Sequence, residues 1–251
     1  MIFWELSMGW KLVLAISVPA ILAIIILTAE ARGPLSAPIQ SCKGIVGPYF
    51  NGIGILFSLY AALFASDAWR KDVDARRFVN AETNASRLIA HTANAMGVTD
   101  SIIPKLRKYL ESSSVEMDRG TVIQSARDNT EHAFDDLVSA IVREPRLDST
   151  SPGILINEAQ DMLKARYDRV QLATDSTVPL KGLPIIIFGT LTQIALMLVH
   201  IGQRRPMRVA VGIFTASFST CLVLTAIFGS PFQLFLPHEP QASLSAVLKR
   251  L

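Results

Sequence analysis

The sequence has 251 residues, of which 50% are hydrophobic and only 18% are charged. Soluble domains contain about 25% charged residues, so this composition excludes an ordinary soluble cytosolic enzyme and favours a membrane protein. The 24 Lys and Arg residues outnumber the 21 Asp and Glu residues, which leaves a net charge of +3. A nucleic-acid-binding module would gather a larger basic excess on one surface, so we expect no nucleic-acid partner.

Four stretches of the chain carry no charged side chain and are long enough to cross a bilayer. They cover residues 12–29, 44–66, 182–203 and 209–229, and a membrane-spanning helix needs about 20 apolar residues. The first stretch is followed by Glu30-Ala31-Arg32 rather than by a small-residue cleavage site, so we predict an anchor and not a cleaved signal peptide. The sequence therefore predicts an all-α polytopic membrane protein with four transmembrane helices.

Four crossings place both termini and residues 67–181 on one side of the membrane, and the connectors 30–43 and 204–208 on the other. Positive residues in short connectors favour the cytoplasmic side, and these connectors contain Arg32, Lys43, Arg204, Arg205 and Arg208. Basic residues also lie near the span ends on the opposite side, namely Lys11, Arg70, Lys71, Arg76, Arg77, Lys181, Lys249 and Arg250. The two groups of charges leave the orientation open.

Residues 67–181 have mixed charge and apolar residues at helical spacing, which predicts a helical domain outside the membrane. No Gly or Pro follows the second span until Gly97, so we expect that span to continue outward as one long helix. Residues 230–251 include a short amphipathic segment. We expect this C-terminal tail to lie at the membrane interface or to pack on the helical domain.

Three further helices are expected in the helical domain. The first begins after Thr99 or Asp100 and carries an apolar stripe formed by Ile103, Leu106, Leu110 and Met117. The next ends at Glu144-Pro145, because a proline disfavours helix in the residue before it. The last begins at Ser151-Pro152, a cap followed by proline at the first helical position, and leads to the third span.

An acidic cluster in this domain is a candidate metal site. Glu131 and Asp135, and likewise His132 and Asp136, are four positions apart on one predicted helix, so each pair shares a face and can contribute to binding a divalent ion. A solvated acidic face explains the same residues, because the loop spacing of calcium sites is absent. No nucleophile elbow, phosphate loop or paired Cys motif occurs, so we expect no catalytic residue and no cofactor.

The second span has one small or polar face, formed by Gly47, Asn51, Gly54, Ser58, Ala61, Ala62 and Ala65. The opposite face is bulky. If several copies assemble around an axis, the small face can line a water-filled path in which aromatic rings form apolar constrictions. The pore-lining candidates are Gly47, Phe50, Asn51, Gly54, Phe57 and Ser58. The alternative is close helix packing, because small residues at four-residue spacing are the usual interface between membrane helices.

Four basic residues, Arg70, Lys71, Arg76 and Arg77, follow the second span. At the mouth of a pore they would concentrate anions. The alternative is that their long side chains reach to the membrane surface and contact lipid headgroups.

Three short motifs occur in order along the chain: Asn80-Ala81-Glu82-Thr83-Asn84, Arg166-Tyr167-Asp168-Arg169-Val170 before Pro179, and Gly229-Ser230-Pro231-Phe232. In order and spacing they resemble the bacterial membrane proteins called bestrophin-like, over nearly the whole chain. The resemblance implies a four-span subunit of the inner membrane, with its termini and helical domain in the cytoplasm. It also implies a pentamer that conducts anions through a pore lined by the second span.

The same motifs contain Glu82, Arg166 and Arg169, which lie on helices leading to and from the membrane. We expect them to form structural ion pairs within the helical domain.

The leading hypothesis is a homo-oligomeric channel in the lipid bilayer that conducts inorganic ions, with anions such as chloride favoured. The second hypothesis is a non-conducting scaffold or sensor whose helical domain binds a partner. A membrane enzyme has no supporting group of residues.

Overall fold

The computed structural model describes residues 8–32, 47–118, 121–147, 151–174, 178–228, 232, 236 and 239–250. Most of the predicted connector 30–43 lies outside these residues. The chain divides into two compact units, the first formed by Met1–Arg70 with Ser176–Gly229 and the second by Lys71–Asp175 with Ser230–Leu251. Each unit is built almost entirely of helices, and the predicted all-α fold is confirmed.

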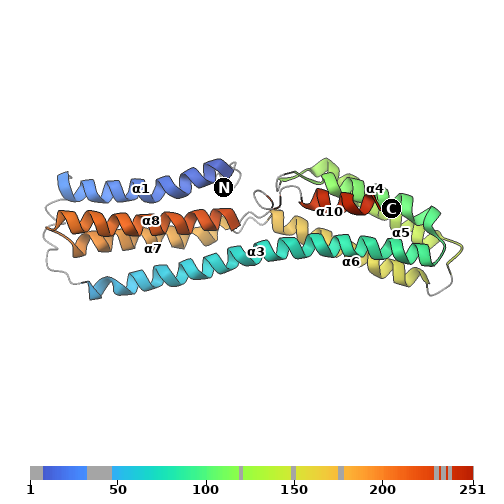
Figure 1. The fold of residues 1–251 in the computed structure, drawn as a ribbon, viewed down its shortest axis with the longest axis horizontal. Helices are drawn as coiled ribbons and strands as arrows, with labels where there is room; N and C mark the ends of the chain where they lie inside the picture. The colour runs from blue at the N-terminus through green and yellow to red at the C-terminus, as the bar shows by residue number, and fades with distance from the viewer. Residues whose placement is uncertain are drawn as a thin grey trace. The chain divides into compact units, whose positions relative to one another are not determined.

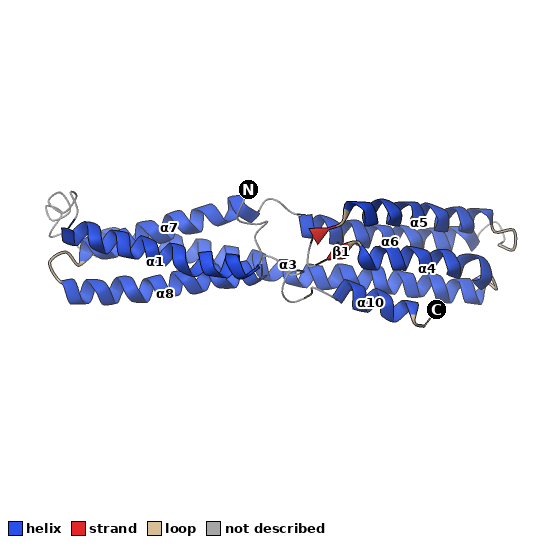
Figure 2. Ribbon diagram, turned by 90° about the horizontal axis from the view of Figure 1, so that it is seen from above, coloured by secondary structure: helices blue, strands red, loops and turns tan. Residues whose placement is uncertain are grey.

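Within its described residues, the first unit contains four helices that are long and apolar enough to cross a membrane. They are α1 (Met8–Arg32), the part of α3 (Pro48–Ala95) up to Arg70, α7 (Val178–Val199) and α8 (Arg204–Phe228). The prediction of four spans is confirmed in this sense. Helices α1, α7 and α8 lie side by side, as Figure 1 and Figure 2 show.

A buried amide ties these three helices together. Gln193, on α7, is fully buried, and its Nε2 donates hydrogen bonds to the carbonyl oxygen of Pro19 at 3.1 Å and to Thr215 Oγ1 at 2.9 Å. Pro19 belongs to α1 and Thr215 to α8. Because an unpaired polar group is costly in hydrocarbon, this contact favours one arrangement of the three helices.

The second unit contains the rest of α3 and most of the polar part of the chain. Its other elements are α4 (Thr99–Val115), β1 (Met117–Asp118), β2 (Thr121–Val122), α5 (Gln124–Arg143), α6 (Ser151–Thr174) and α10 (Glu239–Leu248). The strands are antiparallel, with Met117 opposite Val122. The sequence did not predict this hairpin, and Met117 belongs to β1 rather than to the apolar stripe of α4.

The long helix α3 ends where the sequence predicts its end, next to Gly97. Helix α3 ends at Ala95, and Gly97 adopts a φ of 68°, the left-handed conformation in which glycine is favoured. The N–H of Val98 donates to the carbonyl of Ala93 at 2.9 Å and that of Gly97 to Asn94 at 3.1 Å, which forms a Schellman motif. The predicted continuation of the second span up to Gly97 is therefore confirmed.

The core of the second unit joins α3, α4, α5, α6 and α10. Fully buried residues in it include Ile89, Ile102, Leu106, Leu137, Ile141 and Leu155. Leu244 and Val247 of α10 belong to the same cluster and are only 1% and 2% exposed. The apolar face of the C-terminal segment is therefore occupied by the helical unit, which is the second of the two predicted placements, and not by the membrane interface.

Candidate functional site

The first unit has an open groove along the membrane part of α3. Its volume is about 970 Å³, and α7 and α8 form its other walls. Five of the six pore-lining candidates from the sequence border it, namely Gly47, Asn51, Gly54, Phe57 and Ser58. Polar groups on the facing helices come from Thr192 and Ser217, and no pattern in the sequence associates these residues with α3.

The small face of α3 points away from the packed interior of the unit. Asn51 and Ser58 are exposed, and Gly54 is half-buried. A methyl group added at Gly54 would meet nothing within 4 Å. Phe64 and Phe57, of which Phe57 also borders the groove, are only 6% and 8% exposed. The small and polar side chains are thus available to water or to another subunit, while the aromatic side chains hold α3 to its own unit.

Of the two aromatic pore candidates, Phe50 and Phe57, the structure describes the side chain of Phe57. The ring of Phe57 packs edge-on against Phe214 and Phe218, with ring centroids 5.0 Å and 5.6 Å apart. This packing fixes the ring inside the subunit, so we do not carry a gating role for Phe57 forward. Phe50 belongs to α3, but its side chain lies outside the part of the chain that the structure describes.

The hydroxyl groups of the groove offer acceptors rather than donors. Ser58 Oγ donates to the carbonyl of Gly54 at 2.9 Å, Ser217 Oγ to Ile213 at 3.2 Å and Thr192 Oγ1 to Phe188 at 2.7 Å. Their hydrogens are used within their own helices, which leaves lone pairs toward the groove.

Asn51 differs from these hydroxyls, because no hydrogen bond is recorded for its side chain among the described residues. It lies in the first turn of α3, where unpaired backbone N–H groups carry a partial positive charge. The Asn51 end of the groove therefore has the donors that an anion needs.

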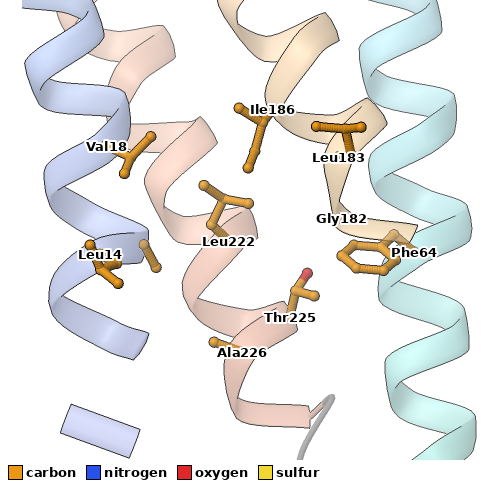
Figure 3. Close-up of a pocket in the computed structure, with 10 residues that line it drawn as sticks. Leu14, Val18, Phe64, Gly182, Leu183, Ile186, Leu222, Thr225 and Ala226 are labelled. Carbon is orange, nitrogen blue, oxygen red and sulfur yellow. The ribbon is translucent and has the colours of Figure 1, made fainter. Parts of the chain in front are cut away.

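A second hollow in the first unit is apolar. It has a volume of about 270 Å³ and lies among α1, α3, α7 and α8, with Leu14, Val18, Phe64 and Leu222 on its walls (Figure 3). Its one hydroxyl, of Thr225, donates to the carbonyl of Cys221 at 2.9 Å. Such a space suits hydrocarbon and offers no ligand to a passing ion.

The four basic residues after the second span are not equivalent. Arg70, Arg76 and Arg77 are exposed, whereas Lys71 is only 8% exposed. Arg76 Nε lies 3.3 Å from Asp72 Oδ2. Arg70 and Arg77 have no ion pair among the described residues, so they present the least compensated charge of the four.

The second unit contains a fully buried network of charges. Arg169 Nε lies 2.9 Å from Glu82 Oε2, and Arg166 Nη2 lies 2.6 Å from Glu116 Oε1. Arg169 Nη2 also lies 3.4 Å from Glu116 Oε2. All four side chains are at most 1% exposed. The network therefore connects α3, the end of α4 and α6 with two positive and two negative charges.

Neutral donors complete the network around Glu82. Tyr109 Oη and Ser113 Oγ donate to Glu82 Oε1 at 3.1 Å and 2.6 Å. Burial and then the charge of Glu82 raise the pKa of Tyr109 well above its usual value, so its hydroxyl stays protonated and donates. Burial acts to lower the pKa of Arg169, but the charges of Glu82 and Glu116 outweigh it and raise that pKa.

Sequence reasoning named three of the four charges and missed Glu116, Tyr109 and Ser113. Glu116 follows the last residue of α4, and no spacing in the sequence marks it as a partner of an arginine on α6. Both carboxylates of the network are paired, while Arg166 Nη1 has no hydrogen-bond partner among the described residues. The buried ion pairs suit a structural role in the helical unit.

The structure does not gather the four metal candidates. Asp136 Oδ2 lies 2.9 Å from Lys108 Nζ and 3.9 Å from Lys105 Nζ, while Glu131 Oε1 lies 3.3 Å from Arg127 Nε. The hydrogen bond and charge of Lys108 lower the pKa of Asp136. His132 and Asp135 are exposed. Within the described ranges, no three His, Cys, Asp or Glu residues lie close enough to hold a metal ion.

A family comparison identifies the chain. The model of the bestrophin-like domain matches residues 17–235. The chain belongs to the bestrophin-like family. The resemblance found in the sequence motifs is thereby confirmed. No match was found among curated proteins.

Solved structures of a bacterial bestrophin homologue from Klebsiella pneumoniae have the same fold. One single-residue variant has 15% sequence identity and a TM-score of 0.69, with 96% of this chain and 98% of that chain covered. Another variant has 14% identity and a TM-score of 0.72, with 97% and 96% covered. A third structure of the homologue has 13% identity and a TM-score of 0.69, with 97% and 99% covered. At these identities the likeness concerns the fold alone.

Proposed function

We propose that this protein is the subunit of an oligomeric membrane ion channel that favours anions, with the small face of α3 lining the pore. The observation that carries the proposal is the placement of Asn51 and Ser58, which are exposed in a groove of the membrane unit, while Phe57 and Phe64 of the same helix are buried. Membership of the bestrophin-like family supports transport rather than catalysis.

An enclosed path requires more than one copy of the chain. The groove is open on one side, so neighbouring subunits must complete its wall. Ile55, Leu59 and Leu63 on α3 are 66%, 57% and 60% exposed, which leaves apolar surface for lipid or for a neighbouring subunit. A homo-oligomer, a pentamer by family resemblance, would cover this surface and place several copies of Asn51 around one axis.

The preference for anions rests on the distribution of donors. Asn51 offers an amide group at the positive end of α3, and Arg70 and Arg77 follow the apolar part of the same helix. Ser58 offers an acceptor, which suits a cation. We therefore assign selectivity to Asn51 and the basic residues, and a passive, water-lining role to Ser58.

The proposed setting is the bacterial inner membrane, with the second unit and both termini in the cytoplasm. The support for this orientation is the family resemblance, because the positive residues in the sequence divide between the two sides.

Ion flux tests the proposal. Purified protein is reconstituted in liposomes under a potassium chloride gradient, and the reversal potential is measured for wild type and Asn51→Leu. Asn80→Leu is the matched control, because Asn80 is an exposed asparagine on α3 outside the groove. We expect a reversal potential near that of chloride, reduced conductance for Asn51→Leu and no change for Asn80→Leu.

Two outcomes would overturn parts of the proposal. A reversal potential near that of potassium would contradict the anion preference. Absence of flux from correctly assembled protein would favour a non-conducting scaffold or sensor, in which the small face of α3 only packs against neighbouring helices.

A further inference from the structure

The second unit contains a cleft whose polar walls are basic. It has a volume of about 300 Å³ and lies where α3, the start of α4 and the end of α10 meet. Arg87, His91 and Asn94 come from α3, Thr99 from α4 and Arg250 from the residues after α10. Helices α4 and α10 lie against each other (Figure 1). Three sequence-distant segments thus contribute to one cleft.

The positive charges of this cleft have no counter-charge in the described part of the chain. No ion pair or side-chain hydrogen bond is recorded there for Arg87, His91 or Arg250, and no Asp or Glu lines the cleft. Asp100 directly follows Thr99 in the sequence but is not among the residues that line the cleft. Elsewhere in the unit, Arg127, Arg146, Arg166 and Arg169 each form an ion pair with a carboxylate. The cleft differs from these four sites, because two arginines without an ion pair among the described residues border one hollow.

The position of Arg250 is defined by packing. Val247, one turn earlier, is 2% exposed and belongs to the core of the unit. The N–H of Arg250 donates to the carbonyl of Val247 at 2.9 Å. The C-terminal segment is thereby held against α4, and its last arginine borders the same cleft as Arg87.

We propose that this cleft binds a small phosphorylated solute of the phosphate-monoester class. Two guanidinium groups match the oxygens of a phosphate dianion, and the imidazole, the Asn94 amide and the Thr99 hydroxyl add further donors. The volume lies at the lower end of small-molecule sites, which suits a monophosphate better than a nucleoside triphosphate. The bound anion connects the C-terminal helix to α3 and α4.

Isothermal titration of the purified full-length protein tests this site without requiring ion conduction. Inorganic phosphate and glycerol phosphate are titrated at constant ionic strength, and chloride is tested as the competing anion. We expect one site per chain for both phosphates, and affinities at least about tenfold weaker for Arg87→Gln and Arg250→Gln, because each removes a charge-assisted contact. Arg107→Gln, an exposed arginine of α4 outside the cleft, is the matched control and keeps wild-type affinity.

Three results would overturn the proposal. They are absence of phosphate binding to the wild type, equal binding by all variants, and displacement of phosphate by equimolar chloride. The same titration in nanodiscs with and without phosphatidic acid separates a soluble ligand from a lipid headgroup. Loss of phosphate binding only when phosphatidic acid is present would reassign the cleft to a lipid phosphate and contradict the soluble ligand.

Discussion

Replacing Glu82 by Gln removes one of the two buried negative charges that face Arg166 and Arg169. Glu82 is fully buried and accepts hydrogen bonds from Arg169 Nε at 2.9 Å and from Ser113 Oγ at 2.6 Å. With a neutral side chain at this position, the two buried guanidinium groups share Glu116 as the one buried carboxylate, and the partly exposed Glu131 lies 3.9 Å from Arg166 Nη2. Breaking a buried ion pair from one side costs about 3–5 kcal/mol, because the remaining charge stays buried without compensation.

We expect the unfolding midpoint of Glu82→Gln to fall by roughly 10 °C, because about 1 kcal/mol shifts the midpoint of a chain of this size by about 2–4 °C. Far-UV circular dichroism of the purified protein in detergent measures the loss of helix. The three tryptophans, Trp4, Trp10 and Trp69, all belong to the first unit. Their fluorescence therefore reports whether the first unit unfolds in the same transition.

Lys108→Gln is the matched control, because Lys108 pairs with Asp136 at 2.9 Å on the exposed surface of the same unit. Solvent screens such a pair, and we expect no measurable change in the midpoint. Replacing Glu82 by Leu together with Arg169 by Met exchanges one charge pair for apolar side chains, which should recover stability relative to Glu82→Gln. Equal midpoints for Glu82→Gln and Lys108→Gln would refute this account of the network.

Two further predictions concern packing and acid stability. A methyl group at Gly189 collides with the ring of Phe218, so Gly189→Ala should destabilise the packing of α7 on α8 by about 1–3 kcal/mol. Gly212→Ala is the control, because a methyl group added at Gly212 meets nothing within 4 Å. Equal thermal midpoints for Gly189→Ala and Gly212→Ala would contradict that contact. The hydrogen bonds of Arg146 and Ser101 lower the pKa of Glu144 from 4.5 to about 2. The ionised Glu144 side chain therefore stabilises the folded protein fully above pH 4.5, and this stabilisation is lost as the pH falls toward about 2. Thermal midpoints of wild type and Glu144→Gln should therefore converge as pH falls through this range, and a difference that stays constant would argue against the ion pair.

The helices could be predicted because their signals are local. Each signal is contained in one short segment of the sequence. The signals are the uncharged stretches long enough to span hydrocarbon, the apolar spacing of α5 and α6, and Gly97 at the end of α3. The hairpin could not be predicted, because strands of two residues show no alternation. The location of α10 was undetermined for another reason, since an amphipathic pattern indicates an apolar face but not which surface covers it.

The candidate site was only partly predictable. The small face of α3 is visible as a four-residue spacing, and the structure places Asn51 and Ser58 on the exposed side of that helix. The inward packing of Phe57 depends on Phe214 and Phe218 of α8, which are far away in the sequence. Glu116 pairs with Arg166 of α6 although 50 positions separate them in the sequence. Contacts between distant helices decide these positions, and no local pattern records them.

The most direct test of the proposed pore is chemical access to Ser58 in a conducting protein. Ser58→Cys is made in a background in which Cys42 and Cys221 are replaced by Ala, and current is recorded across a planar bilayer while a charged, water-soluble thiol reagent is added. We expect rapid loss of current for Ser58→Cys. We expect no effect for Leu63→Cys, because Leu63 is exposed on α3 and does not border the groove. Current that is unaffected in Ser58→Cys, or equally blocked in Leu63→Cys, would contradict the claim that the small face of α3 lines the ion path.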